Sequence, residues 1–271
     1  MRFLLFLIAL CTAAPASAKP RAVSLDYCSD QYLLMLGDPE QITALSRGSD
    51  KDYSYLRAQS APYPKVRPNL EEVAPHKPDI VLRQWGGGAN AEELFSRFDA
   101  TVVSLDYPED FDGVIANILL AAAVLEQMEK GEALVAHLQE RLHTLETRTD
   151  SHKNMRALYV TPGGVTAGAH TMIDAIFKAA GVINISAEAG QNYWPPLPAE
   201  ALLLAPPELI VSGFFVSKDE QINFWSSARH PALQKLLRDT PTVQLPPDII
   251  SCAAWFSVDA AEMIAQETRH P

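Results

Sequence analysis

Short apolar runs, each followed by an amphipathic segment, make up most of the chain. The runs at 79–82, 102–105 and 209–211 are rich in Val, Ile and Leu and have the length of strands. Strands that are apolar on both faces are typical of parallel sheets, because helices cover both sides of such sheets. The pattern therefore predicts an α/β fold with parallel sheets.

The same arrangement occurs twice along the chain. In the first copy, Glu71 stands seven residues before Pro78, which is followed by an acidic residue and an apolar run. In the second copy, Glu200 stands seven residues before Pro207, again followed by an acidic residue and an apolar run. The two copies are offset by 129 residues at both positions. This repetition indicates two α/β units of similar plan.

Each copy opens in the same way. A strand-like segment stands at 21–25 in the first copy and at 156–160 in the second, and a helical pattern follows both. Gly37 and Gly181 stand where these helical patterns end. A glycine in that place is typical of a left-handed residue that closes a helix. We therefore predict a left-handed helix end at both glycines.

A helical pattern over 111–148 connects the two units. Leucine and methionine recur along it every three or four residues, and charged residues fill the other side. Its second part, 125–148, would span roughly 36 Å as a helix. We expect this part to be a rigid strut between an N-terminal lobe, 19–124, and a C-terminal lobe, 149–271.

The first 18 residues have the features of a secretory signal. Arg2 supplies a positive charge, residues 3–13 are almost unbroken apolar, and Ala16 and Ala18 place small side chains where signal peptidase cleaves. The apolar stretch is too short for a permanent bilayer anchor. We expect cleavage after Ala18, export to the periplasm, and a mature chain that does not insert into the membrane.

Charge argues against a nucleic-acid partner. The chain carries 22 Lys and Arg residues against 33 Asp and Glu residues, a formal net charge of −11. Binding to nucleic acid requires clustered basic residues that displace counterions from the phosphates. The acidic balance instead indicates a solvated surface that keeps the protein in solution.

Two cysteines, Cys28 and Cys252, follow the signal. In an oxidising compartment an even number favours a disulfide, which here would tie the start of the chain to its end. Two separate buried thiols are the alternative, because free cysteine is among the most buried residue types. The sequence leaves both possibilities open.

Aromatic residues gather in the loops beside the predicted strands. In open parallel sheets, ligands bind beyond the carboxyl ends of the strands, and these loops lie there. Aromatic walls suit a large, flat or apolar-rimmed ligand, although each ring has the alternative of folding over a sheet edge. The candidate ligand contacts are Trp85, Tyr193, Trp194, Trp225, Trp255 and Tyr53. The nearest cations for an anionic ligand are Arg83 and Arg47, for which surface salt bridges are the alternative.

The sequence contains none of the common hydrolase or metalloprotease motifs. It lacks G-x-S-x-G, H-E-x-x-H and C-x-x-C. The seven histidines are scattered, and only His170 stands in a loop where it would face a cleft. We therefore expect no enzymatic activity, no cofactor and no metal site.

Five segments carry a family resemblance, and they occur in a specific order and spacing. They are 24–31 (SLDYCSDQ), 69–71 with 77–81, 168–184, 230–233 and 251–255. Together they resemble the periplasmic binding proteins of importers for iron–siderophores, haem and vitamin B12. The resemblance implies two Rossmann-like lobes joined by a single long backbone helix, with the ligand between the lobes. The chain departs from the family at Ala253-Ala254, where Gly-Gly is frequent.

The resemblance also implies a docking mode. In this family one surface glutamate on each lobe engages arginines of the two permease subunits, and Glu71 and Glu200 match these positions. Two equivalent anions suit a two-fold partner, whereas stabilisation by a helix dipole would explain each glutamate only singly. Trp85 matches an aromatic residue that lines the cleft in B12-binding relatives.

These observations predict a monomeric solute-binding protein of an ABC importer. The expected ligand is a metal chelate, in the first place a ferric siderophore, then cobalamin, then haem. A free metal ion is disfavoured because the sequence lacks a cluster of metal-ligating residues. The alternative of another class is a periplasmic sensor or enzyme on the same scaffold, which would need a catalytic constellation in the cleft.

Overall fold

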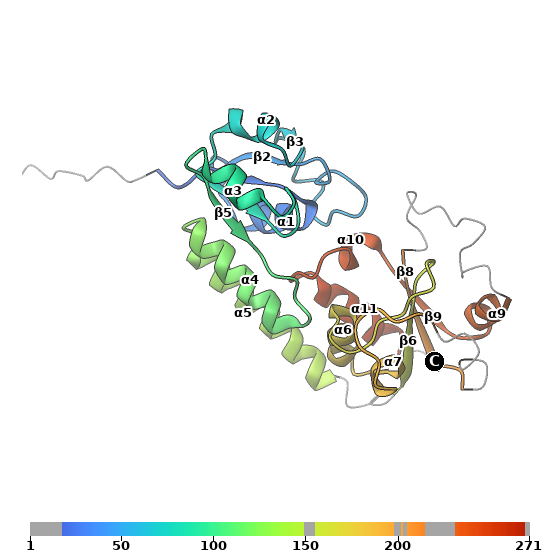
Figure 1. Cartoon of the computed structure of the whole chain (residues 1–271). Coiled ribbons are helices and arrows are strands. Elements are labelled where there is room, and N and C mark those ends of the chain that lie inside the picture. Colours follow the sequence, from blue (N-terminus) through green and yellow to red (C-terminus); the bar gives the residue numbers. More distant parts are fainter. Residues whose placement is uncertain (1–17, 149–154, 198–201, 203–204, 215–230, 269–271) are drawn as a thin grey trace, which may run out of the picture.

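Two α/β lobes make up the protein (Figure 1). The computed structural model describes residues 18–148, 155–197, 202, 205–214 and 231–268. The N-terminal lobe contains a five-stranded sheet in the order β3-β2-β1-β4-β5, in which all neighbours are parallel. Its strands are β1 (Ala22–Ser24), β2 (Ile42–Ser46), β3 (Lys65–Val66), β4 (Ile80–Arg83) and β5 (Thr101–Ser104).

The C-terminal lobe repeats this plan with a four-stranded parallel sheet in the order β7-β6-β8-β9. Its strands are β6 (Arg156–Val160), β7 (Ile183–Asn184), β8 (Leu209–Gly213) and β9 (Thr242–Leu245). The strands β1 and β8 are buried over their whole length, as continuous apolar runs require. The prediction of two α/β lobes with parallel sheets is confirmed.

Helices cover the two sheets. The N-terminal lobe carries α1 (Tyr27–Leu36), α2 (Leu70–Val73), the 3-10 turn η1 (Ala74–His76), α3 (Ala91–Ser96) and α4 (Phe111–Val124), and α5 (Met128–Arg148) leads to the second lobe. The C-terminal lobe carries α6 (Met172–Ala180), α7 (Ile185–Glu188), α9 (Pro231–Asp239), α10 (Pro247–Ile250) and α11 (Ser257–Glu267). None of the helices in the described part of the chain is long and apolar enough to cross a bilayer.

Only one of the two predicted left-handed helix ends forms. Gly181 closes α6 at φ 77°, as predicted. Gly37 closes α1 at φ −64°, so that prediction is wrong. A side chain at Gly37 would place its Cβ 2.8 Å from the carbonyl oxygen of Leu33. The glycine is needed there for a close approach of backbone to backbone rather than for a positive φ.

The helical stretch predicted over 111–148 is two helices, not one. Glu126 has a φ of 55°, and the chain turns between α4 and α5 at this residue. The two helices then pack closely, since a Cβ at Gly131 would lie 2.4 Å from the Cβ of Ala122. The sequence pattern missed this turn because the apolar stripe continues through it.

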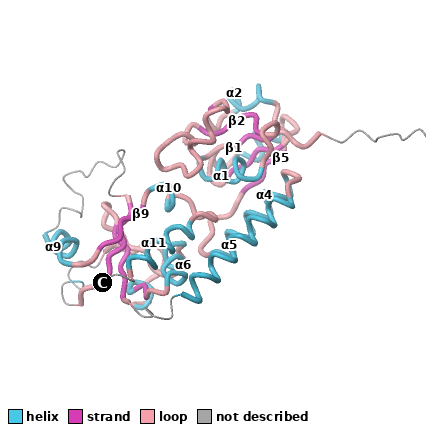
Figure 2. Tube along the Cα trace, turned by 180° about the vertical axis from the view of Figure 1, so that it is seen from behind, coloured by secondary structure: helices cyan, strands magenta, loops and turns pink. Residues whose placement is uncertain are grey.

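The helix α5 is the strut that runs from the N-terminal lobe to the C-terminal lobe (Figure 2). Its 21 residues correspond to roughly 31 Å. Near its start, Lys130 Nζ donates to the carbonyl oxygen of Leu36, 3.0 Å away, in the N-terminal lobe. Further along, Arg141 forms ion pairs of 2.7 Å with Asp259 and Glu262 of α11. Each lobe therefore forms polar contacts with one part of α5.

A second set of contacts joins the lobes beside the strut. Residues 248–259 of the C-terminal lobe pack against the loop 47–63 of the N-terminal lobe. The Tyr55 ring stacks on Phe256 with 4.2 Å between ring centroids, and its hydroxyl donates to Asp259 Oδ2. Arg57 forms an ion pair of 2.7 Å with Asp248. Because two separate connections join them, the lobes are held in a fixed relation.

Candidate functional site

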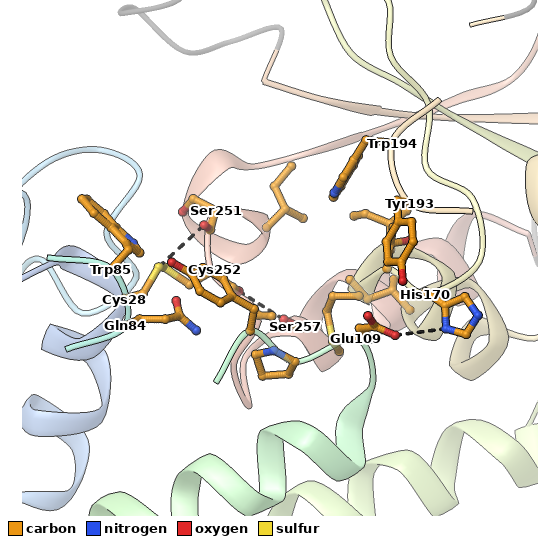
Figure 3. A pocket seen from close by; sticks show the side chains of 18 of the residues that line it. Cys28, Gln84, Trp85, Glu109, His170, Tyr193, Trp194, Ser251, Cys252 and Ser257 are labelled. Carbon is orange, nitrogen blue, oxygen red and sulfur yellow. Dashed lines mark hydrogen bonds and ion pairs between the residues drawn. A yellow bond between two sulfur atoms is a disulfide. The ribbon is translucent and has the colours of Figure 1, made fainter. Parts of the chain in front are cut away.

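A cavity of about 420 Å³ opens between the two lobes, at the carboxyl ends of both sheets (Figure 3). The N-terminal lobe contributes Tyr27, Cys28, Gln84, Trp85, Tyr107, Pro108 and Glu109 to its lining. The C-terminal lobe contributes an apolar set, Met172, Ile173, Ile176, Ile250 and Ala253. It also contributes His170, Thr171, Tyr193, Trp194, Ser251, Cys252 and Ser257.

Trp85 forms the N-terminal wall of the cavity. It follows β4 directly, and 44% of its surface is exposed although it is a large apolar residue. Its ring stands edge-on to Tyr27, with 5.4 Å between the centroids, and Tyr27 stands edge-on to Tyr53 at 4.7 Å. Burial raises the pKa of the Tyr27 phenol, which therefore stays neutral at physiological pH.

Tyr193 and Trp194 form the opposite wall. Both side chains are more than half exposed, at 57% and 53%. The backbone of Tyr193 has a φ of 56° and is held by two hydrogen bonds of 2.8 Å, from its N–H to Ala169 and from the N–H of Gly168 to its carbonyl. Backbone hydrogen bonds therefore fix the course of the loop that carries Tyr193 and Trp194 opposite Trp85.

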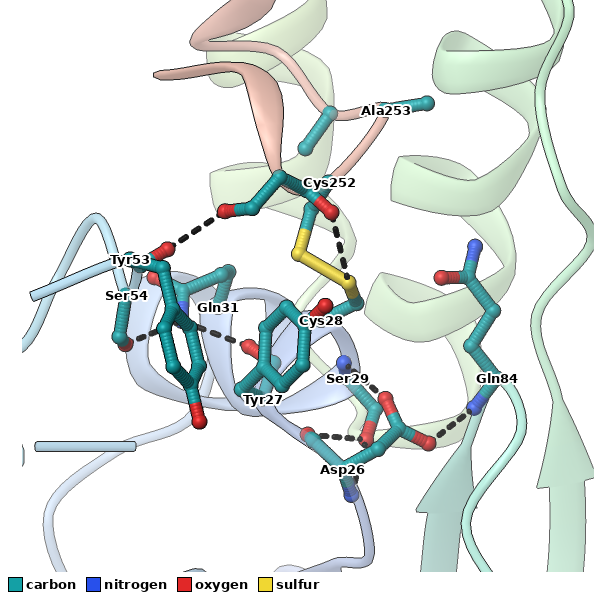
Figure 4. Close-up of a disulfide and its surroundings, with 12 residues drawn as sticks. Asp26, Tyr27, Cys28, Ser29, Gln31, Tyr53, Ser54, Gln84, Cys252 and Ala253 are labelled. Carbon is teal, nitrogen blue, oxygen red and sulfur yellow. Dashed lines mark hydrogen bonds between the residues drawn. A yellow bond between two sulfur atoms is a disulfide. The ribbon is translucent and has the colours of Figure 1, made fainter. Parts of the chain in front are cut away.

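A disulfide between Cys28 and Cys252 forms the floor of the cavity (Figure 4). The sequence left this pairing open. The two Cα atoms are 5.5 Å apart, and the bond joins the first turn of α1 to the segment before α11. Beside it, Ser251 Oγ donates to the carbonyl oxygen of Tyr53 at 2.6 Å. The floor is therefore a covalent and hydrogen-bonded junction between the lobes.

A polar contact crosses from one lobe to the other at the side of the cavity. His170 Nδ1 lies 3.0 Å from Glu109 Oε2 (Figure 3). Glu109 follows β5 in the N-terminal lobe, and His170 precedes α6 in the C-terminal lobe. The contact occupies one ring nitrogen of His170 and one carboxylate oxygen of Glu109, so this wall of the cavity is polar.

No lysine or arginine is among the residues that line the cavity in the described part of the chain. Among the described residues of the lining, Glu109 is the one carboxylate, and it lies against His170. In the same described part, no group of three or more His, Cys, Asp or Glu side chains is placed to hold a metal ion. The site is thus aromatic and weakly charged.

Four of the predicted ligand contacts do not line the cavity. Trp255 is only 6% exposed and packs edge-on against Tyr32 and Phe256. Tyr53 packs edge-on against Tyr27 and is not part of the lining. Arg83 donates to the carbonyl oxygen of Gly88 at 2.7 Å.

Arg47, the fourth, is engaged in an ion pair of 3.1 Å with Glu72 on the surface. Trp225 and the predicted docking residue Glu200 lie outside the described residues. Of the predicted contacts, Trp85, Tyr193 and Trp194 are those that the structure brings to the cavity.

Sequence reasoning missed several residues of the lining. Tyr27 and Gln84 follow β1 and β4, and Tyr107 and Glu109 follow β5. The position beyond strand ends is a usable signal, but the predicted aromatic contacts included only the four tryptophans, Tyr53 and Tyr193. Tyr107, which is 67% exposed and stands three residues beyond the end of β5, is the clearest residue that a wider use of this rule would have found.

The predicted docking residue Glu71 lies on the surface and does not line the cavity. It stands in the first turn of α2, which begins after the N-cap Asn69, and it is exposed. Its neighbour Glu72 is occupied, because it accepts hydrogen bonds from Arg47 and from the N–H of Arg67. No hydrogen bond or ion pair to Glu71 forms within the described residues.

A family model described as "Periplasmic binding protein" matches residues 23–246 of the chain. Two curated proteins called "Cobalamin-binding protein", from two strains of Halobacterium salinarum, are each 25% identical over 208 residues. These residues are 74% of this chain and 56% of each relative, so the chain spans little more than half the length of these relatives.

Several solved structures share the fold at low sequence identity. The periplasmic haem-binding protein HutB of Vibrio cholerae has a TM-score of 0.75 and 17% identity, covering 93% of this chain and 99% of that one. The haem-binding protein RhuT of Roseiflexus sp. RS-1 has a TM-score of 0.71 and 18% identity, covering 93% and 100%. The vitamin B12 binding protein BtuF of Vibrio cholerae has a TM-score of 0.68 and 19% identity, covering 93% and 97%.

Proposed function

We propose that this chain, which belongs to the periplasmic binding protein family, captures cobalamin or a related corrinoid between its lobes. In this proposal it is the solute-binding component of an ABC importer and is exported by the signal at 1–18. The observation that carries the proposal is the character of the cavity. Aromatic walls from both lobes face each other across a weakly charged space.

The chemistry of a corrinoid matches this cavity. A corrin ring is a large, nearly flat macrocycle whose rim carries neutral amides. Trp85 on one side and Tyr193 and Trp194 on the other offer apolar ring surfaces to such a ligand. Gln84 and the pair of Glu109 and His170 provide polar contacts for the amides. The name of the curated relatives supports the same ligand class.

This proposal changes the order of ligands that the sequence suggested. An anionic ferric siderophore needs cations beside it, because a buried charge without a partner is costly. The two candidate cations, Arg83 and Arg47, are engaged elsewhere, and Glu109 would repel an anion. Haem ranks after cobalamin for the same reason, because its two propionates also carry negative charge.

We also propose that Glu71 docks on the permease. It is exposed and has no partner within the described residues, whereas the neighbouring Glu72 is held by Arg47. The repeat in the sequence pairs it with Glu200 of the other lobe. An acidic contact on each lobe suits two equivalent basic contacts on a two-fold permease. A sensor on the same scaffold would bind the ligand without needing this surface.

Isothermal titration of the purified mature protein with four chelates tests the ligand class. The set contains cyanocobalamin, ferrichrome as an uncharged siderophore complex, ferric enterobactin as an anionic one, and haemin. We expect saturable binding of cyanocobalamin with a sub-micromolar Kd and much weaker binding of ferric enterobactin. Tight binding of ferric enterobactin or haemin with no heat from cyanocobalamin would contradict the proposal.

A further inference from the structure

The carboxylate of Asp26 gathers four backbone N–H groups from two parts of the N-terminal lobe. Its Oδ1 accepts from the N–H of Ser29 at 2.9 Å, which caps α1. Its Oδ2 accepts from the consecutive N–H groups of Gln84, Trp85 and Gly86, at 2.7, 3.0 and 2.9 Å. Figure 4 shows Asp26 between Ser29 and the loop that carries Gln84.

This carboxylate is buried and is held by amides. Asp26 is only 1% exposed, and none of the ion pairs in the described part of the chain includes it. Backbone N–H groups and the N-terminus of α1 supply the partial positive charge that a buried anion needs. Hydrogen bonds to an ionised acceptor are also stronger than those between neutral groups.

Three consecutive N–H groups reach one oxygen atom only when the backbone of residues 84–86 folds around it. The carboxylate of Asp26 therefore fixes the conformation of this loop. Gly86 makes the fit close, because a Cβ there would lie 2.4 Å from the carbonyl oxygen of Leu25. The loop thus rests directly on residues 25 and 26.

Trp85 is the residue whose position depends on this loop. Its side chain stands at the cavity while its own N–H points at Asp26. The aromatic wall of the other lobe is built differently, since backbone-to-backbone hydrogen bonds hold Tyr193 in place. A side-chain substitution at Asp26 can therefore remove the hydrogen bonds that hold the loop of Trp85, whereas the backbone hydrogen bonds that hold Tyr193 do not depend on a side chain.

We propose that Asp26 is the positioning residue of the N-terminal aromatic wall. Its carboxylate sets the place of the Trp85 indole and thereby the affinity for the ligand, although Asp26 itself does not line the cavity. The part that concerns affinity rests on the proposed function, whereas the part that concerns the indole does not. Two experiments separate these parts.

The first experiment needs no ligand. Asp26→Ser keeps a good N-cap for α1 but lacks the second oxygen that holds the loop. The emission of Trp85 is obtained by subtracting the spectrum of a variant that also carries Trp85→Phe. We expect this emission to shift to the red and to become more accessible to acrylamide. The matched control is Asp110→Ser, at the N-cap of α4, where the side chain accepts only from Gly113.

An unchanged Trp85 emission in Asp26→Ser would overturn the proposal. If the serine variant does not fold, as judged by circular dichroism, Asp26→Asn takes its place. The asparagine keeps the shape and one acceptor oxygen, but its amide opposes the N–H groups that the carboxylate gathers. It is therefore expected to give the same change in Trp85 emission, and an unchanged emission would overturn the proposal equally.

The second experiment is a double-mutant cycle with cyanocobalamin as the probe. Asp26→Ser should weaken binding at least about tenfold in the wild-type background, a loss of about 1.4 kcal/mol. In a Trp85→Ala background the same substitution should have almost no effect, because its route to the ligand is gone. Equal losses in both backgrounds would show a general effect on the fold and would overturn the proposal. If the wild type binds no cyanocobalamin, the proposed function fails, and the Trp85 emission alone decides on Asp26.

Discussion

Replacing Cys28 and Cys252 together with serine should lower the free energy of unfolding by about 5 kcal/mol. The disulfide closes a loop with a sequence separation of 224 residues, nearly the whole mature chain. Cross-linking restricts the unfolded chain, and the entropy lost there grows with the logarithm of the loop length. For a loop of this size the relation gives about 5 kcal/mol at 25 °C.

Urea unfolding of the oxidised wild type and of the double serine variant measures this difference. For a chain of this size the melting temperature should also fall by roughly 10–20 °C, at about 2–4 °C for each kcal/mol. Wild type treated with a reductant is the control and should match the variant. A loss below about 1 kcal/mol would refute the reasoning, since it would mean that the bond does not constrain the unfolded chain.

Three further predictions concern other parts of the molecule. Burial raises the pKa of Asp30 to about 7 from 3.8, so its neutral form is favoured in the fold and its ionisation makes stability fall as pH rises from about 4 to 7. The free energy of unfolding of Asp30→Asn minus that of the wild type should therefore be roughly 2–3 kcal/mol larger at pH 8 than at pH 5, as measured by urea titration. A difference between the two proteins that does not change with pH would contradict this. Glu71→Ala should abolish uptake of radiolabelled cyanocobalamin while the Kd stays unchanged, and Glu132→Ala, an exposed acid on α5, should affect neither; a weakened Kd would place Glu71 in the cleft. Gly131→Ala should destabilise the protein by about 1–3 kcal/mol despite the better helix propensity of alanine, because its Cβ would lie 2.4 Å from that of Ala122, and a more stable variant would show that α4 and α5 separate freely.

The sequence predicted the parts of the fold that rest on local pattern. Apolar runs such as 209–211 have the period and length of buried strands, and β8 is found there. The repeat indicated two lobes of one plan, and the strut was expected where α5 lies. Each of these features depends on residues that are close together in the chain.

The parts that failed depend on contacts between distant residues. Nothing local marks Glu126 as a left-handed turn, because the reversal is stabilised by the packing of α5 on α4. Trp255 follows a segment near the cavity, yet its ring turns inward against Tyr32 of the other lobe. Arg83 stands beside Trp85 in the sequence, but its guanidinium is used by the carbonyl of Gly88.

In the candidate site, too, local sequence pattern was predictive and contacts between distant residues were not. Loops beyond strand ends were the correct region, and Trp85, Tyr193 and Trp194 lie at the cavity. Which loops of the two lobes face one another follows from the strut and from the junction around Cys252, and no single sequence pattern encodes that. The contact between Glu109 and His170 joins residues 61 positions apart and was not foreseen.

Quenching of tryptophan fluorescence by cyanocobalamin, in the wild type and in Trp85→Ala, tests whether a corrinoid binds between the aromatic walls. Phe98→Ala is the matched control, because Phe98 is 51% exposed and does not line the cavity. We expect saturable quenching with one site and a sub-micromolar Kd in the wild type and the control. Binding should be weaker by at least about tenfold in Trp85→Ala. Absence of saturable quenching in the folded wild type, or equal affinity in all three proteins, would contradict a corrinoid site between the aromatic walls.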